Sequence, residues 1–346
     1  MLHTTFGRGT GLRVSEYALG TANYATGPDA PAGPAEARAI FDAFAEAGGT
    51  FIDTSDRYQD GQSETVLADL LAADRDRFVL STKYTRGSEG KYGISENGNG
   101  RKTMVRSLEA SLRRLGTDYV DVYWAHLPDG VTPVEEIVAT FDDLVRAGKI
   151  LHGGLSNFPA WRVAAAATQA VLRDRAPVVG IQVAYNLADR TAERELLPMA
   201  EAFGLGAALY SPLAGAVLTG KFRQDGHGSR RPARPEDGHT SAVLDTVLDV
   251  ADECGTNAAQ VSVAWLRARA ARSATALIPV IGPRTTAQLH AYLAALDLTL
   301  TDEQYERLER VSAVALGTPH ETVAAALPTI FGGDPGLLRR HPVPVV

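Results

Sequence analysis

Cysteine is nearly absent from this sequence, since Cys254 is the single example among 346 residues. One thiol cannot close an intramolecular disulfide or build a thiolate metal site, so both kinds of site are excluded. The eight histidines show no H-E-x-x-H motif or other close ligand pairing, and we expect no metal. The first residues lack the apolar stretch and cleavage site of a secretory signal, which favours a cytoplasmic protein.

Long hydrophobic runs and clusters of basic residues are also missing. No stretch of about 18 apolar residues occurs, so no membrane-spanning helix is expected. The net charge is −7 and no block of consecutive Lys/Arg residues occurs, which argues against a nucleic-acid partner. Hydrophobic residues make up 45% and charged residues 22%, as in a folded globular chain. Lysine supplies only 5 of the 34 basic residues, so a lysine at a structured position is conspicuous.

Short apolar or β-branched runs recur along the chain, separated by segments whose apolar residues have helical spacing, such as Ile137, Phe141 and Leu144. The eight runs are Tyr17–Gly20, Thr50–Asp53, Phe78–Lys83, Tyr119–Trp124, Ile150–Leu155, Val178–Val183, Gly206–Ser211 and Leu277–Ile281. Most are apolar on both faces, as a parallel sheet covered by helices requires. The pattern predicts an α/β protein in which strands and helices alternate.

Two architectures fit this alternation. A doubly wound open sheet would need a glycine fingerprint, G-x-G-x-x-G, directly after its first strand, and none follows residues 17–20. We therefore predict a (β/α)8 TIM barrel. The prediction is a single domain over residues 1–346, with a barrel core at 14–312 and an irregular, proline-containing tail at 313–346.

An N-terminal β-hairpin and two long loops are predicted as additions to the barrel. Thr4–Phe6 and Leu12–Val14 flank a glycine-rich turn and predict a hairpin that plugs the bottom of the barrel. Thr85–Gly100 and Phe222–His239 interrupt the regular spacing after the third and seventh strands. Loops that follow barrel strands lie on the C-terminal face, where active sites are built. We expect these loops to contribute to specificity.

Local signals mark some helix ends. Thr132–Glu135 has the composition of a capping box with a proline at the first helical position. Gly116 and Gly148 follow the last periodic residues of two helices and are predicted to be left-handed caps.

Ionisable residues stand at the ends of three consecutive strands. Asp53 ends the second strand, Lys83 ends the third, and the fourth runs into His126. A charged residue at the end of an apolar strand is expected to pair with an opposite charge or to take part in catalysis, because burying an unpaired charge costs folding free energy. One reading is a structural ion pair between Asp53 and Lys83. The other is a proton donor at Tyr58, since a neighbouring ammonium lowers the pKa of a phenol below its reference of about 10.

Seven short motifs, in this order, resemble the aldo-keto reductase family. They are Phe51–Tyr58, Ser81–Lys83, Trp124–Asp129, Gly154–Asn157, Ile181–Gln182, Tyr210–Leu213 and Gly220–Lys221. The resemblance covers nearly the whole chain, from about Phe6 to Leu308. The family is a (β/α)8 barrel that binds a nicotinamide dinucleotide without a separate dinucleotide-binding domain. The resemblance therefore implies NADP(H) as cofactor and a small-molecule carbonyl compound as substrate.

The resemblance also implies catalytic roles. Tyr58 would protonate the carbonyl oxygen of the substrate. Lys83 and Asp53 would tune the acidity of that phenol, and His126 would orient the carbonyl group. All four positions match the family pattern.

Cofactor contacts are implied in the same way. Ser156, Asn157 and Gln182 would hold the nicotinamide carboxamide, because an amide needs both donors and acceptors. Tyr210 would stack on the nicotinamide ring. The remaining implied positions are Gly20, Thr21, Ser211, Pro212, Leu213, Gly215, Lys221, Gly282, Arg284 and Gln288.

The match is incomplete after the last strand. Arg284 could bind an adenosine 2′-phosphate. The alternative interpretation, which has equal weight, is that Arg284 is a solvent-exposed arginine of an ordinary loop. Gln288 fits the family pattern, but its Glu and Asn positions hold Ala291 and Tyr292. This departure leaves the adenine contacts undefined.

The expected function is NADPH-dependent reduction of an aldehyde or ketone, for which a keto-sugar or a secondary-metabolite carbonyl would serve. The alternative is a redox-sensing regulatory subunit that binds the cofactor with negligible turnover. The complete set of Asp53, Tyr58, Lys83 and His126 favours the enzyme. The sequence determines neither the substrate nor the oligomeric state.

Overall fold

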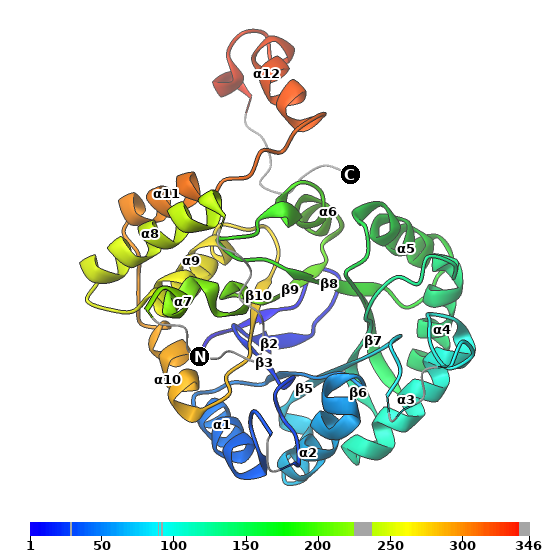
Figure 1. Ribbon diagram of the computed structural model, residues 1–346. Coiled ribbons are helices and arrows are strands. Elements are labelled where there is room, and N and C mark those ends of the chain that lie inside the picture. Colours follow the sequence, from blue (N-terminus) through cyan, green and yellow to red (C-terminus); the bar gives the residue numbers. More distant parts are fainter. Residues whose placement is uncertain (28–29, 89, 91–92, 225–236, 339–346) are drawn as a thin grey trace.

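A computed structural model describes residues 1–27, 30–88, 90, 93–224 and 237–338. Eight parallel strands form a closed barrel in which β10 pairs with β3 (Figure 1). The strands are β3 (Ala18–Gly20), β4 (Phe51–Asp53), β5 (Val79–Tyr84), β6 (Val120–Ala125), β7 (Ile150–Ser156), β8 (Val178–Ala184), β9 (Gly206–Tyr210) and β10 (Leu277–Ile281). Each lies within one residue of its predicted limits, and the predicted (β/α)8 barrel is confirmed.

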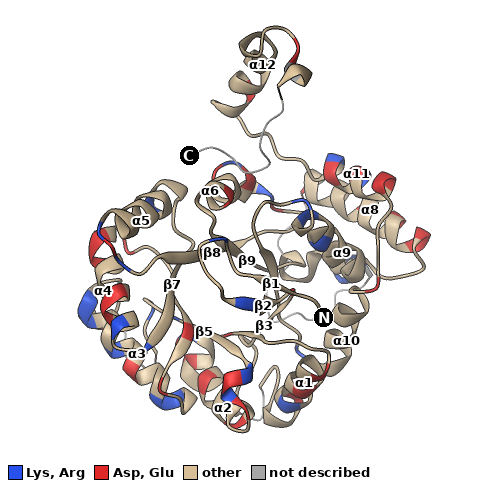
Figure 2. Ribbon diagram, turned by 180° about the vertical axis from the view of Figure 1, so that it is seen from behind, with Lys and Arg blue, Asp and Glu red and all other residues tan. Residues whose placement is uncertain are grey.

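The N-terminal hairpin is also confirmed, displaced by one residue. β1 (His3–Thr5) and β2 (Arg13–Ser15) pair antiparallel and lie across the end of the barrel that faces the viewer in Figure 2. Phe6, directly after β1, is fully buried, and its ring packs edge-on against Phe51 at 5.8 Å and Trp124 at 6.2 Å. These aromatic contacts fill the barrel interior below the strand ends that carry the polar residues.

Glycines make room for Phe6 on the opposite wall of the barrel. A Cβ atom added to Gly180 would lie 2.5 Å from the backbone oxygen of Gly206 and 2.6 Å from the Phe6 ring. A Cβ on Gly206 would lie 2.7 Å from the same ring. Real Cβ atoms do not approach neighbours so closely, so the ring and the two glycines fit together as one packing unit.

Helices surround the barrel and carry most of its surface charge (Figure 2). They are α1 (Pro34–Glu46), α2 (Gln62–Leu71), α3 (Arg101–Leu115), α4 (Val134–Arg146), α5 (Ala160–Leu172), α6 (Leu196–Phe203), α7 (Lys221–Gln224), α8 (Gly238–Glu253), α9 (Ala258–Ala270), α10 (Thr286–Ala294), α11 (Asp302–Val311) and α12 (His320–Ile330). Short 3-10 segments are η1 (Tyr58–Gly61), η2 (Arg75–Arg77), η3 (Thr191–Glu193), η4 (Ala214–Thr219) and η5 (Pro335–Leu337). In α4, Ile137, Phe141 and Leu144 are buried at the predicted helical spacing.

The two glycine caps are confirmed, whereas the capping box is wrong. Gly116 and Gly148 have φ of 63° and 68°, conformations that favour glycine. Before α4, however, the N-cap is Pro133 and no side chain caps the helix. The Thr132 hydroxyl donates instead to Oδ2 of Asp129 at 2.5 Å, so it is not available to the helix.

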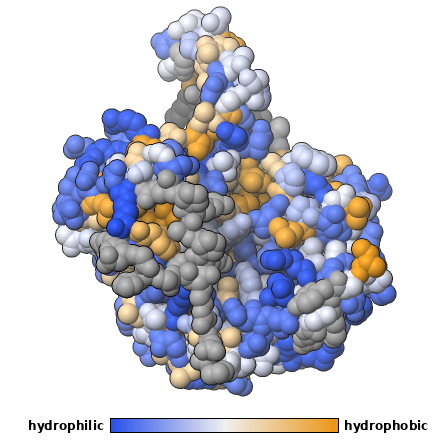
Figure 3. Space-filling model, in the orientation of Figure 1, coloured by the Kyte–Doolittle hydropathy of each residue, from blue (hydrophilic) through white to orange (hydrophobic). Residues whose placement is uncertain are grey.

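The tail corrects the expectation of an irregular segment. After Gly317 the chain forms α12, which projects away from the barrel beyond α6 and α11 (Figures 1 and 3). Its alanine-rich sequence has high helix propensity, with Glu321 in the first turn. Most of the predicted loop Phe222–His239, namely 225–236, lies outside the described residues, as do residues 339–346 of the tail. No helix in the described ranges is long and apolar enough to span a membrane.

Candidate active site

The ends of β4, β5 and β6 bring the four candidate catalytic residues together. In the sheet register Asp53 pairs with Ser81, and Lys83 pairs with Trp124 two residues before His126. Tyr58 opens η1, the short turn after β4. The predicted cluster therefore lies at the C-terminal end of the barrel strands, where TIM-barrel chemistry is found.

Lys83 is the centre of this cluster. It is fully buried and Asp53 is 2% exposed. Its ammonium group donates to Oδ2 of Asp53 and to the carbonyl of Thr54, each at 2.6 Å, and to the Tyr58 hydroxyl at 3.1 Å. The structural ion pair considered from the sequence is present, and the phenol is in direct contact with it.

The pKa of Tyr58 is raised above its usual value, which corrects the expected direction. Burial, the largest influence, penalises the phenolate, and the positive charge of Lys83 offsets only part of that effect. The negative charge of Asp53 acts in the same direction as burial. Burial opposes the charged form of Lys83 too, but the charge and hydrogen bonds of Asp53 raise the pKa of Lys83 above its usual value. Near neutral pH the cluster contains a neutral phenol and a charged ammonium.

His126 stands edge-on to Tyr58, with ring centroids 6.2 Å apart and an interplanar angle of 86°. Burial, followed by the positive charges of Lys83 and Arg86, lowers the pKa of His126 to about 3. Its Nδ1 lies 3.4 Å from the Ser55 hydroxyl. The imidazole is therefore neutral near pH 7 and acts as a hydrogen-bonding group rather than as a cation.

Sequence reasoning gave no role to Ser81 and Ser55, which contact this cluster, and did not foresee that Gln182 contacts it too. The Ser81 hydroxyl donates to Oδ1 of Asp53 at 2.7 Å, and Gln182, assigned from the sequence to the cofactor, donates to the same oxygen at 3.0 Å. Ser55 contacts the cluster through His126. Ser81 could have been found, because it stands two residues before Lys83 on the same strand face.

The turn that carries Tyr58 has left-handed backbone conformations and is fixed by hydrogen bonds. Gln59 and Asp60 both have left-handed conformations, with φ of 48° and 57°. The side-chain amide of Gln59 donates to the carbonyl of Ala22 at 2.8 Å, and the Ser63 hydroxyl donates to the carbonyl of Tyr24 at 2.8 Å. The turn that carries Tyr58 is thus tied to the loop after β3.

The residues assigned to the carboxamide lie together at the ends of β7, β8 and β9. Ser156 pairs with Gln182 in the sheet register. Asn157 donates to the Ser156 hydroxyl at 3.0 Å and to the carbonyl of His126 at 3.1 Å, and its Oδ1 accepts from the Tyr210 hydroxyl at 2.8 Å. The Ser156 hydroxyl and the Gln182 oxygen supply the donor and acceptor that a carboxamide requires.

The segment after β9 has an unusual backbone. Ser211, Ala214, Gly215 and Ala216 have φ of 57°, 50°, 65° and 76°. In many proteins, successive backbone N–H groups in turn conformations form anion-binding concavities. Pro212 is buried and Leu213 packs against the core. The exposed Lys221, which follows this segment, lies over the ring of Phe222.

The positions after β10 fit a phosphate less completely. Arg284 is partly buried and directly precedes the N-cap Thr285 of α10, a position that favours a phosphate group. The Gln288 side chain accepts from the N–H of Arg284 at 2.8 Å, so it caps backbone rather than facing a ligand. Gly282 accepts through its carbonyl from Asn23 at 3.3 Å. Tyr292 packs against the core.

Gly20 and Thr21 end the first barrel strand. A Cβ on Gly20 would lie 3.0 Å from the Val280 side chain, so a larger residue there would require β10 side chains to shift. The Thr21 hydroxyl donates to the carbonyl of Asp53 at 3.1 Å. Both residues therefore lie between β4, which ends in Asp53, and β10, which precedes Arg284.

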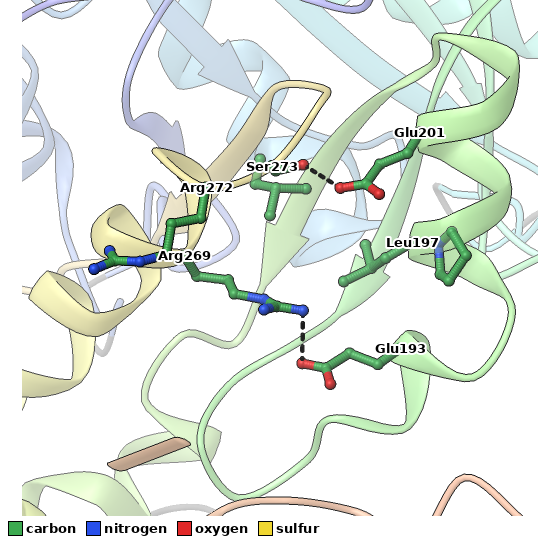
Figure 4. Close-up of a pocket in the computed structure, with 8 residues that line it drawn as sticks. Glu193, Leu197, Glu201, Arg269, Arg272 and Ser273 are labelled. Carbon is green, nitrogen blue, oxygen red and sulfur yellow. Dashed lines mark hydrogen bonds and ion pairs between the residues drawn. The ribbon is translucent and has the colours of Figure 1, made fainter. Parts of the chain in front are cut away.

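A separate hollow of about 250 Å³ lies on the flank of the barrel between α6 and α9 (Figure 4). The Ser273 hydroxyl donates to Glu201 at 2.7 Å, and Arg269 pairs with Glu193 at 3.7 Å. These groups satisfy one another, and the hollow reaches β10 at its first residue, Leu277, rather than at its C-terminal end. It therefore does not belong to the candidate site.

Comparison with known proteins agrees with this geometry. A model of the aldo/keto reductase family matches residues 17–313. Norsolorinic acid reductase of Aspergillus flavus is 33% identical over 92% of this chain and 82% of its own length. An uncharacterized oxidoreductase of Bacillus subtilis is 36% identical over 88% of this chain and 93% of its own length. A putative aryl-alcohol dehydrogenase of Saccharomyces cerevisiae is 32% identical over 95% and 89%. The chain belongs to the aldo/keto reductase family, oxidoreductases that act on small-molecule carbonyl compounds with a nicotinamide cofactor.

Proposed function

We propose that this protein uses NADPH to reduce an aldehyde or ketone to an alcohol, with Tyr58 as the proton donor. The observation that carries the proposal is the contact of the buried Lys83 ammonium with the Tyr58 hydroxyl at 3.1 Å and with Asp53 at 2.6 Å. A neutral phenol beside a fixed cation is suited to giving up a proton when negative charge grows on a nearby oxygen.

Each residue of the cluster has a distinct part in this reaction. Tyr58 donates its proton to the carbonyl oxygen, and Lys83 stabilises the phenolate that remains. His126 is neutral, so it positions the carbonyl by a hydrogen bond rather than by supplying a proton. Asp53 keeps Lys83 charged. The bound nicotinamide supplies the hydride.

The cofactor contacts support the same proposal. Ser156 and Gln182 offer a donor and an acceptor to the carboxamide, and the ring of Tyr210 offers a stacking face. The left-handed segment around Gly215 suits the pyrophosphate. Arg284, beside the N-terminus of α10, would bind the 2′-phosphate that distinguishes NADPH from NADH.

The names of the relatives suggest the chemical class of the substrate. One is a norsolorinic acid reductase and another a putative aryl-alcohol dehydrogenase. We therefore extend the proposal to carbonyl groups attached to aromatic rings.

The test is NADPH oxidation with a panel of aromatic, aliphatic and sugar carbonyl compounds, alongside a fluorescence titration of cofactor binding. Turnover that prefers aromatic aldehydes or ketones supports the proposal. Tight NADPH binding without turnover on any carbonyl would favour the regulatory subunit instead.

Cofactor preference is tested separately with Arg284→Ala. Loss of a charge-assisted phosphate contact should weaken NADPH binding by roughly 10- to 150-fold and leave NADH binding unchanged. Equal affinities for both cofactors in the unmodified protein would contradict the assignment of Arg284.

A further inference from the structure

Arg86 is a charged residue at the mouth of the candidate site to which the sequence motifs give no role. It lies three residues after Lys83, just beyond the end of β5. Its side chain is exposed. Within the described parts of the chain, its guanidinium group makes no hydrogen bond or ion pair.

The residue before Arg86 fixes the path of the chain as it leaves the strand. Thr85 has φ of 108°, a conformation that β-branched residues rarely adopt. Its hydroxyl donates to Oδ1 of Asn99 at 2.7 Å and accepts from the N–H of His126 at 3.2 Å. Its carbonyl accepts from the N–H of Gly98 at 2.9 Å. Strained backbone that is held in this way clusters at ligand sites.

The position next to Thr85 brings the charge of Arg86 close to the reacting groups. Thr85 contacts the backbone of His126, and Lys83, on the same strand, contacts Tyr58. In agreement with this placement, the positive charge of Arg86 acts on both Tyr58 and His126. The carbonyl group of a substrate would lie between those two side chains, so Arg86 is placed to meet another part of the same molecule.

Two described cations near the reacting groups have carboxylate partners. Lys83 pairs with Asp53 at 2.6 Å, and Arg57 pairs with Asp60 at 3.2 Å. Arg86 differs from both, because no described carboxylate pairs with it. An accessible, unneutralised guanidinium beside the reacting groups is a recognition element for an anion.

We propose that Arg86 binds a carboxylate of the substrate, so that this enzyme selects aldehydes or ketones that carry an acidic group. The inference rests on the proposed reductase activity. The planar guanidinium binds a carboxylate through two parallel hydrogen bonds, which gives both orientation and affinity. Arg86 is thereby a specificity-determining residue.

The experiment compares a charged substrate with its neutral isostere. The probes are para-carboxybenzaldehyde and its methyl ester, each measured for kcat and KM with NADPH. The variants are Arg86→Gln, which removes the charge, and Arg86→Lys, which keeps it. Arg173→Gln, which removes an exposed arginine just after α5, is the matched control.

The unmodified enzyme should use the acid with kcat/KM about 10-fold or more above that of the ester, and Arg86→Gln should remove this difference through KM. Arg86→Lys should keep part of it, and Arg173→Gln all of it. Added salt should reduce the preference for the acid. Equal use of acid and ester by the unmodified enzyme would overturn the proposal. So would an equal loss on both substrates in Arg86→Gln, which would show that Arg86 acts only on Tyr58 and His126.

A binding measurement separates this inference from the proposed function. Calorimetric titration with para-(hydroxymethyl)benzoate, the alcohol product of the acid, requires no turnover. Binding that is weakened about 10-fold or more in Arg86→Gln supports the carboxylate contact even if no carbonyl compound is reduced. Unchanged binding in Arg86→Gln overturns the contact, whereas failure to reduce the methyl ester counts against the proposed function.

Discussion

Gln182 donates a hydrogen bond from its side-chain amide to Oδ1 of Asp53 at 3.0 Å. Both residues are 2% exposed, and they come from β8 and β4, which are not neighbours in the barrel. The contact therefore crosses the barrel interior. It joins the side of the site that we assign to the cofactor to the side that we assign to proton transfer.

Replacing Gln182 should affect both sides at once. Gln182→Met keeps the size of the side chain but leaves one oxygen of a buried carboxylate with fewer donors. We expect a loss of about 1–3 kcal/mol in the free energy of unfolding together with weaker NADPH binding. Denaturant unfolding and fluorescence titration measure the two effects. Weaker NADPH binding with an unchanged free energy of unfolding would mean that the hydrogen bond to Asp53 does not contribute to stability.

Tyr58→Phe should remove reduction and spare cofactor binding. The change deletes the hydroxyl that gives up the proton and keeps the ring. Loss of a general acid lowers rates by roughly 100-fold or more. We expect a loss of this size in kcat, with an NADPH dissociation constant within about twofold of the unmodified value. Substantial activity in Tyr58→Phe would identify a different proton donor.

The pH dependence of reduction follows from the two pKa directions. Reduction needs the protonated phenol, and burial raises the pKa of Tyr58, so the rate should fall only as pH rises above about 10. Because the pKa of His126 is about 3, its titration should not change the rate of reduction near neutral pH. The chemical step of reduction should be flat from about pH 5 to 9, whereas alcohol oxidation should rise with pH. A reductive rate that falls between pH 6 and 8 would contradict the raised pKa.

Removing the buried cation should cost stability as well as activity. Lys83→Met leaves Asp53 as a buried charge without its ammonium partner. Breaking one side of such a pair typically destabilises a protein by about 3–5 kcal/mol. The double variant Asp53→Asn with Lys83→Met should recover part of that loss without recovering reduction. Denaturant unfolding gives the free energy of unfolding of both variants. A double variant less stable than Lys83→Met would contradict this account.

Asp56 gives a prediction about stability alone. It is 1% exposed, and burial, followed by the charge of Glu64, raises the pKa of Asp56 to about 7. Since the unfolded carboxyl titrates near 3.9, ionisation opposes folding progressively from about pH 4 to 7, and the full effect is present above pH 7. Asp56→Asn should gain on the order of 3–4 kcal/mol relative to the unmodified protein between pH 4 and pH 8. A difference in unfolding free energy that is constant with pH would refute this.

The fold was predictable where the hydrophobic pattern is strong. Parallel barrel strands are apolar on both faces, so all eight stood out, and Gly116 and Gly148 marked two helix ends. The predictions that failed concern places where two local interactions or propensities compete, and the hydrophobic pattern does not show which one prevails. Asp129 takes the hydroxyl that a capping box would have used, and alanine-rich sequence within the proline-containing tail forms α12.

The candidate site was predictable only in part. Asp53, Lys83 and His126 could be grouped because parallel strands bring their ends to one face. The bond from Gln182 to Asp53 could not, because barrel closure brings them together across 129 residues. The direction of the Tyr58 pKa depends on how deeply the phenol is buried, and sequence spacing carries no information about that depth.

The fit between Phe6 and the glycines at 180 and 206 has a consequence for how related sequences vary. A larger side chain at position 206 demands a smaller one at position 6, so these two positions should change together during divergence, whereas position 180 should stay glycine because the backbone oxygen of Gly206 also confines it. The hairpin and the barrel wall are then inherited as a unit. The polar rim above them is free to diversify, and new substrate preferences can arise without disturbing the base on which the chain folds.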